Sequence, residues 1–127
     1  MAIQISDSEL IIMKFIWKQN GRAMYSEIVQ GLEDMDLQWK KNTILTFLAR
    51  LVEKGCLRVE KIGRRNDYIA LLTEEEYRSQ QTQSFVGKIY DGNVKGLISA
   101  LVEQEAISSA DLDELRSFWD KKGKKHD

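Results

Sequence analysis

Several residue types on which whole classes of protein depend are scarce in this sequence of 127 residues. It has no proline, one cysteine (Cys56) and one histidine (His126). A single cysteine excludes an internal disulfide framework and fits a reducing compartment. Because Cys56 and His126 lie far apart in the sequence, they also provide no ligand set for zinc or copper. We therefore expect neither a metal nor another cofactor.

Signals for membrane insertion, export and catalysis are missing as well. The apolar run 10–17 is too short to span a bilayer, and Lys14 interrupts it. The sequence lacks the basic leader and cleavage site of a signal peptide, so we expect a cytoplasmic protein without stable membrane association. No Ser/His/Asp arrangement or phosphate-binding glycine loop occurs, and the acidic run 74–76 suits a helix start. The sequence predicts no catalytic residues and no enzyme activity.

The charge is distributed unevenly along the chain, whose formal net charge is −1. Residues 39–65 contain eight basic and two acidic side chains, whereas residues 1–38 contain three and six, and residues 66–127 contain eight and twelve. Phosphate binding depends on the local field and not on the total charge. The central basic segment is therefore the part in which we expect a nucleic-acid-binding surface.

The first part of the chain carries the pattern of three helices. A capping box, Ser6-x-x-Glu9, precedes an apolar run that ends near residue 20. A second helix is expected from about residue 25, and a third from about 41 to 54, before Gly55 as a C-cap. The buried faces predicted for the second and third helices consist of Ile28, Val29, Leu32 and Met35, and of Ile44, Leu48, Leu51 and Val52.

Strand signals follow these helices. Residues 57–60 alternate between apolar and polar, residues 67–72 are rich in strand formers, and the turn composition 63–66 between them places Arg64 and Arg65 at the tip. Three helices followed by a hairpin is the order of a winged helix-turn-helix. We therefore predict a mainly α protein with a small β-hairpin wing, in which residues 1–73 form a DNA-binding domain.

Residues 74–127 are predicted to be helical and to need a partner. Capping boxes at Thr73/Glu76 and Ser108/Asp111 and a turn at 91–93 delimit three amphipathic helices. About 50 residues are marginal as an independent core, so burial against a second copy of the chain is expected. A two-fold dimer would also match a palindromic operator. The predicted dimerisation residues are Tyr77, Phe85, Ile89, Tyr90, Leu97, Ile98, Leu101, Leu112, Leu115 and Trp119.

The third helix and the hairpin tip contain the candidate DNA contacts. Amide and hydroxyl groups on the polar side of the helix can address base edges, and lysines at its start can meet phosphates. Arginines at a wing tip can contact the backbone or enter a minor groove. The predicted DNA-binding residues are Lys40, Lys41, Asn42, Thr43, Thr46, Arg50, Lys54, Arg64 and Arg65. The plain alternative is a solvated helix face and a polar turn.

Two residues allow a structural and a functional interpretation. Trp39 could stack on a base or pack beneath the start of the third helix, and Cys56 could be a redox sensor or a buried thiol. Their positions, one before a helix and one between a helix cap and a strand, favour burial for both.

Several motifs resemble those of the BlaI/MecI/CopY family of bacterial repressors, and the similarity spans nearly the whole chain. They are Ile5–Leu10 with Met13-Lys14-x-Ile16-Trp17, Trp39, Thr43-Ile44, Arg50-Leu51-Val52-x-Lys54-Gly55, Gly63-Arg64, Tyr68, Ser84-Phe85 and Tyr90-Asp91-Gly92. The resemblance implies a homodimeric repressor that binds dyad operators ahead of resistance or stress genes, commonly those for β-lactamase.

The resemblance also implies a route of induction. In the penicillinase-repressor branch, a membrane sensor protease is associated with cleavage in the dimerisation region, which aligns with Ala100-Leu101 here, where well-known members have Asn-Phe. The cysteine cluster of the copper-responsive branch is absent, which excludes copper sensing by that route. Lys40-Lys41 stand where the family often has Ser/Thr-Pro.

A winged helix can also serve as a protein-interaction adaptor, whose basic surface binds an acidic partner instead of DNA. Sequence-dependent binding to duplex DNA would distinguish the repressor from this alternative.

Overall fold

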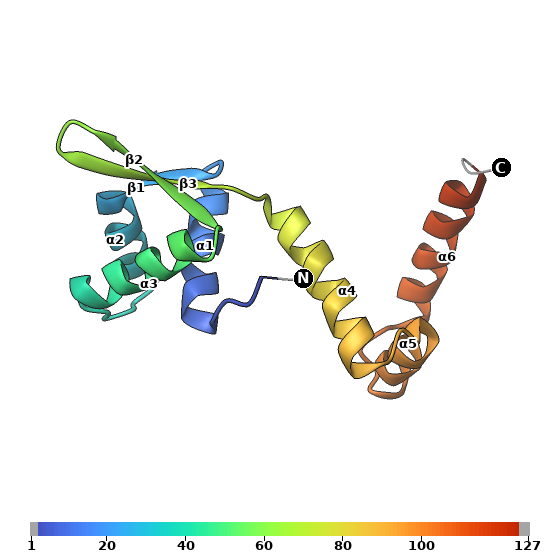
Figure 1. Cartoon of the computed structure of the whole chain (residues 1–127). Helices are drawn as coiled ribbons and strands as arrows, with labels where there is room; N and C mark the ends of the chain where they lie inside the picture. The colour runs from blue at the N-terminus through green and yellow to red at the C-terminus, as the bar shows by residue number, and fades with distance from the viewer. Residues whose placement is uncertain (1–2, 125–127) are drawn as a thin grey trace. The chain divides into compact units, whose positions relative to one another are not determined.

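Helices and one small antiparallel sheet form the structure, a computed structural model that describes residues 3–124 (Figure 1). The elements in chain order are α1 (Asp7–Lys18), β1 (Arg22–Met24), α2 (Tyr25–Asp34), α3 (Lys41–Glu53), β2 (Leu57–Ile62), β3 (Arg65–Ala70), α4 (Glu74–Ile89), α5 (Val94–Glu103) and α6 (Ser109–Lys124). The chain divides into two compact units, Met1–Thr82 and Gln83–Asp127, and the division falls inside α4.

The first unit has the core of a winged helix. The predicted capping box starts α1: the Glu9 amide donates to the Ser6 hydroxyl over 3.1 Å, and the Ser6 amide donates to Glu9 Oε1 over 2.7 Å. Gly55 follows α3 with a φ of +81°, as a helix-ending residue requires. The helices bury their apolar stripes against each other and against the sheet, through Ile12, Met13, Ile16, Ile28, Leu32, Ile44, Leu48, Leu51 and Leu57.

The sheet contains a strand that the sequence pattern did not predict. The strand order is β1-β3-β2, with β1 paired to β3 and Met24 opposite Asp67. Three residues are too few to show an alternating pattern, and β1 forms because β3 provides a partner 45 positions further along the chain. A second correction concerns Met35, which was expected in the core. It lies just beyond the end of α2, and 43% of its surface is exposed.

Trp39 and Cys56 are placed as the structural interpretation predicts. Trp39 is half-buried and meets the Phe47 ring edge-on, with 5.3 Å between the ring centroids. Cys56 is buried, and this burial raises the pKa of its thiol, although the charge of Lys54 opposes the shift. Both residues are therefore part of the packing of the first unit.

The first half of α4 belongs to the first unit. The Trp17 indole N–H donates to the Leu72 carbonyl over 3.0 Å, and the Trp17 and Tyr77 rings lie 5.6 Å apart. Further along α4, the Gln81 side-chain amide donates to the Ile3 carbonyl over 2.9 Å. The predicted boundary between two functional domains, 1–73 and 74–127, stays a prediction. The boundary between the two compact units falls nine residues later, after Thr82.

The second unit is helical, as expected from its capping residues. Asn93 accepts a hydrogen bond from the Gly96 amide at the start of α5, and Ser108 and Asp111 form the predicted reciprocal box before α6. Across residues 3–124 no helix combines the length and the apolar character needed to cross a membrane.

Candidate nucleic-acid interface

The face of α3 opposite the core is exposed and mostly polar. Ile44, Leu48 and Leu51 are fully buried, so the helix can present only its other side to a ligand. Four of the predicted DNA-binding residues, Asn42, Thr43, Thr46 and Arg50, are exposed there. The Thr46 hydroxyl donates to the Asn42 carbonyl over 2.9 Å, which leaves its oxygen lone pairs and methyl group available.

The start of α3 favours a negatively charged ligand. Lys40 is the N-cap residue, its side chain makes no capping hydrogen bond, and the first turn contains no acidic residue. The first backbone N–H groups of a helix lack partners within the helix and lie at the positive end of its dipole. The ammonium groups of Lys40 and Lys41, both exposed, add to this field. This end of α3 therefore combines positive charge with free hydrogen-bond donors.

Lys54, which was predicted as a DNA contact, forms an ion pair within the protein. Its Nζ lies 2.7 Å from Glu9 Oε1, and the Glu9 side chain is only 1% exposed. Burial is the largest influence on the Glu9 carboxyl and acts to raise its pKa. The hydrogen bonds from Lys54 and Ser6, together with the Lys54 charge, outweigh it and lower the pKa. Lys54 thus joins the end of α3 to the start of α1. Its role as a DNA contact stays a prediction.

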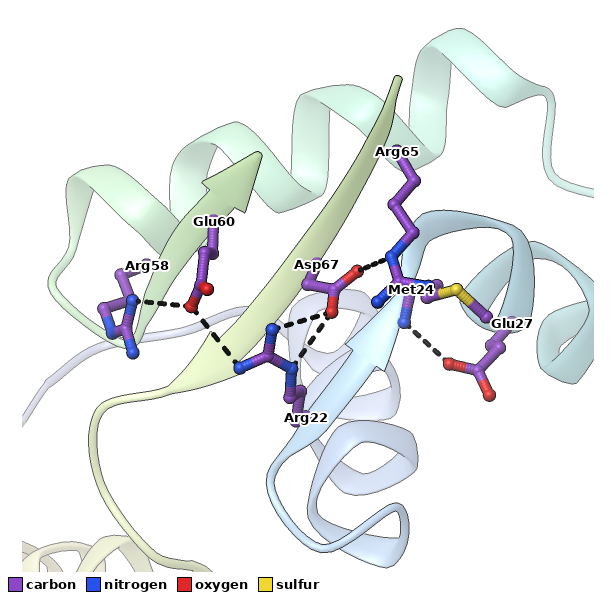
Figure 2. A network of polar contacts seen from close by, with 7 residues as sticks. All are labelled: Arg22, Met24, Glu27, Arg58, Glu60, Arg65 and Asp67. Carbon is purple, nitrogen blue, oxygen red and sulfur yellow. Dashed lines mark hydrogen bonds and ion pairs between the residues drawn. The ribbon is translucent and has the colours of Figure 1, made fainter. Parts of the chain in front are cut away.

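The two predicted wing arginines lie in different parts of the hairpin formed by β2 and β3, one in the turn and one in a strand. Only Gly63 and Arg64 form the turn, because Ile62 already pairs with Arg65. Arg65 is therefore a strand residue and not a tip residue, which corrects the prediction. Its Nε lies 3.1 Å from Asp67 Oδ1 (Figure 2).

A network of ion pairs ties the three strands together (Figure 2). Glu60 and Asp67 lie directly opposite each other on β2 and β3, an arrangement that is unfavourable for two carboxylates unless cations neutralise them. Arg22, on β1, donates its Nε to Asp67 Oδ2 over 3.0 Å and places Nη1 3.4 Å from Glu60. The hydrogen bond to Asp67 is the main cause of the raised pKa of Arg22. Arg58 approaches Glu60 from the other side, also at 3.4 Å.

This network decides which wing cations are available to a ligand. Arg22, Arg58 and Arg65 have carboxylate partners within the sheet. Arg64 and Lys61 are exposed and take part in no ion pair within residues 3–124. Lys61 is a candidate that the sequence interpretation omitted, because a single lysine in an alternating strand gives no distinctive pattern.

A hollow of about 370 Å³ lies between the start of α2, the middle of α3 and the wing. It brings together segments that are far apart in the sequence, and its lining includes two arginines, an asparagine, a serine and a tyrosine. Its lining residues are Met24, Tyr25, Ser26, Leu45, Arg64, Arg65 and Asn66. Of these, only the two arginines were predicted as site residues. A concave basic surface beside the exposed face of α3 suits a nucleic-acid strand.

The residues predicted for dimerisation fall into two groups. Tyr77 packs on Trp17 in the first unit and is separated from the others, which lie in the second unit. There, α4 and α5 contain no fully buried side chain. Phe85, Ile89, Ile98, Leu112, Leu115 and Trp119 are exposed, whereas Tyr90, Leu97 and Leu101 are half-buried. Trp119 has 71% of its surface exposed, which is unusual for so large an apolar side chain.

The predicted cleavage position lies in a helix. Ala100 and Leu101 are both within α5 and half-buried. No group of three potential metal ligands occurs among the side chains that the structure describes; His126 lies outside those residues.

Comparison with known proteins assigns the chain to a family. The penicillinase repressor family model matches residues 5–121. The penicillinase repressor of Bacillus licheniformis is 33% identical over 112 residues, covering 88% of this chain and 86% of that protein. The methicillin resistance regulatory protein MecI of Staphylococcus aureus strain N315 is 29% identical over 119 residues, covering 94% and 95%.

Solved structures agree with this result for the first unit. The solution structure of the DNA-binding domain of the repressor BlaI superposes with a TM-score of 0.53 at 38% identity, covering 61% of this chain and 92% of that one. The monomeric Bacillus licheniformis BlaI in complex with the blaP half-operator gives a TM-score of 0.50 at 39% identity, covering 58% and 88%. The fold of the first unit is therefore that of a winged-helix DNA-binding domain. The chain belongs to the penicillinase repressor family, a family of transcriptional repressors and not of enzymes.

Proposed function

We propose that this protein is a homodimeric repressor that binds a palindromic operator in double-stranded DNA and controls a β-lactamase, antibiotic-resistance or stress operon. The observation that carries the proposal is the exposed polar face of α3 with its uncapped, lysine-rich start, next to the basic hollow of the wing. The structure of the related BlaI in complex with the blaP half-operator supports DNA binding by this unit.

In the proposed complex, α3 enters the major groove and the wing lies along the backbone. Asn42, Thr43, Thr46 and Arg50 would face base edges, because they occupy the exposed side of the helix. The start of α3, with Lys40 and Lys41, would meet phosphates. At the wing, Arg64 and Lys61 are the cations without a carboxylate partner in the described chain, so they are the proposed backbone contacts. Arg65 directs its Nε to Asp67 and its side chain is 53% exposed, so its remaining donors could add a weaker contact whose charge Asp67 partly neutralises.

Binding of full-length protein to the DNA upstream of its own gene, with random duplex as competitor, tests the DNA-binding part. Each phosphate contact contributes about one unit to the slope of log affinity against log salt. We expect R64A to weaken binding to all duplexes and to lower this slope by about one. Binding that ignores sequence would contradict an operator-specific repressor. No binding to any duplex would favour the adaptor alternative.

Dimerisation is proposed for the second unit, because its apolar faces lack a cover within residues 3–124. Leu115, Phe118 and Trp119 expose 55%, 63% and 71% of their surfaces on one helix. A second copy would bury such faces symmetrically, and linking two half-site readers raises operator affinity through the effective concentration of the second reader.

Sedimentation equilibrium tests the dimer with a matched pair of variants. L115E puts a charge on the apolar face of α6, and S117E puts the same charge on the same helix two positions away, where the side chain is polar and exposed. We expect L115E to be monomeric with weak operator binding and S117E to remain dimeric. A dimeric L115E that binds normally would contradict the proposal.

A membrane sensor protease is the proposed inducing partner, on the basis of the family resemblance. Cleavage between Ala100 and Leu101 would separate part of α5 and all of α6 from the rest of the chain. Intact-mass measurement of the protein from its host, before and after β-lactam exposure, should then show a fragment that ends at Ala100. Derepression with the chain intact would indicate another signal.

A further inference from the structure

The exposed side of α3 carries one large apolar side chain, Leu45, among its polar residues. Leu45 has 43% of its surface exposed in the middle of the helix, whereas Ile44 and Leu48 beside it are buried. Exposed leucines are common on protein surfaces, so exposure alone carries no function. What distinguishes Leu45 is its surroundings. It lies three residues after Asn42 and four before the exposed Ala49, so the three side chains share one side of α3.

Leu45 is also the contribution of α3 to the hollow beside the wing. The rest of the lining combines Arg64, Arg65 and Asn66 from the hairpin with Met24, Tyr25 and Ser26 from the end of β1 and the start of α2. An occupant that suits this mixed lining offers negative charge or hydrogen-bond acceptors to its polar residues and an apolar group to Leu45. A wholly apolar ligand would leave the Arg64 guanidinium without a partner, and a simple anion would leave Leu45 exposed.

A strand of duplex DNA satisfies both requirements. Its phosphates suit the arginine side of the hollow. In the major groove, thymine alone among the four bases presents a methyl group, which apolar side chains contact. We propose that Leu45 packs against the 5-methyl group of a thymine and thereby specifies thymine at one position of each half-site. This inference rests on the proposed function, because it requires α3 to lie in the major groove.

The test uses full-length protein and a duplex selected by that protein from a randomised library. Each thymine of one half-site is replaced singly by deoxyuridine, which removes the 5-methyl group and keeps the base pairing. Removing one methyl group from an apolar contact should weaken binding about fourfold, the value of one buried CH₂. We expect such a loss at one thymine for the wild type, and less than a twofold loss at the same thymine for L45A.

A second variant separates this role from general damage to the fold. Leu71 is also an exposed leucine, 52% exposed, but it follows β3 at the end away from the wing tip. L71A should keep the full sensitivity to deoxyuridine. L45A should keep the salt dependence of the wild type, because no phosphate contact is lost.

The outcomes distinguish this inference from the function on which it rests. If the selected duplex binds specifically but no thymine is sensitive, or if L45A remains as sensitive as the wild type, the assignment of Leu45 is wrong and the repressor proposal stands. If selection enriches no sequence, sequence-specific DNA binding itself fails, and the thymine contact fails with it.

Discussion

Replacing Lys54 by methionine separates a structural lysine from a DNA-binding one. The Lys54 ammonium lies 2.7 Å from a Glu9 carboxylate that is 1% exposed. K54M would leave this carboxylate buried without its cation, and breaking such a pair costs about 3–5 kcal/mol in a fully buried site. The Lys54 side chain is 35% exposed, so water can partly replace the ammonium. We therefore expect a loss of about 2–3 kcal/mol in the free energy of unfolding.

Urea unfolding followed by the fluorescence of Trp17 and Trp39, in a W119F background, measures this loss. For a unit of this size the midpoint of thermal unfolding should fall by on the order of 10–20 °C. Lys61 provides the control, because it is an exposed lysine without an ion pair in the described chain. K61M should change stability by less than about 0.5 kcal/mol.

For DNA binding we expect the reverse order, with an effect of K61M and none of K54M. K54M should leave the salt dependence of operator affinity unchanged at temperatures where the protein is folded, whereas K61M should lower the slope by about one. A K54M protein as stable as the wild type, with a slope reduced by one, would place Lys54 on the DNA and refute the reasoning.

The same ion pair predicts a pH dependence. The pKa of Glu9 in the folded protein is lower than its ordinary value of 4.5, so the folded state favours the charged form. The resulting stabilisation is complete above the unfolded value and is lost as the pH falls through the folded one. The difference in stability between wild type and E9Q should therefore shrink below about pH 4.5 and be constant near neutrality. A difference that grows on acidification would contradict the lowered pKa.

Two further predictions concern packing. A Cβ at Gly31 would lie 2.2 Å from the Phe15 ring, whereas one at Gly87, in α4, would meet nothing within 4 Å. In urea unfolding, G31A should therefore lose about 1–2 kcal/mol of stability and G87A should gain about 0.5–1 kcal/mol. Equal effects of the two substitutions would argue against the close approach of α1 and α2. Because Cys56 is buried and its pKa is raised, the native thiol should react with a disulfide reagent on the order of a hundredfold more slowly than in urea. Rapid reaction of the folded protein would mean that this part of the core opens readily.

Local patterns were sufficient for most of the helical framework. The capping boxes at Ser6/Glu9 and Ser108/Asp111 join residues three positions apart, so the sequence contains both partners of each hydrogen bond within one helical turn. The same holds for Gly55, whose left-handed conformation follows from its place after an apolar helix. The basic segment 39–65 likewise needs only residue counts, and it includes α3, β2 and the turn of the wing.

Only the tertiary structure decided which charged and apolar side chains are available to a ligand. The partner of Lys54 lies 45 positions earlier in the chain, and so does that of Asp67, Arg22 on β1. Without its contact to Glu9, Lys54 looks like the other basic residues of the segment 39–65, and without its contact to Trp17, Tyr77 resembles the residues of the second unit. For Leu45, in contrast, the sequence gives no sign of a site residue. It becomes a candidate only because the folded chain places it in the hollow that α2, α3 and the wing form together. Local hydrogen bonds are encoded in adjacent residues, but the pairing of distant charges and the exposure of a side chain depend on how the chain packs.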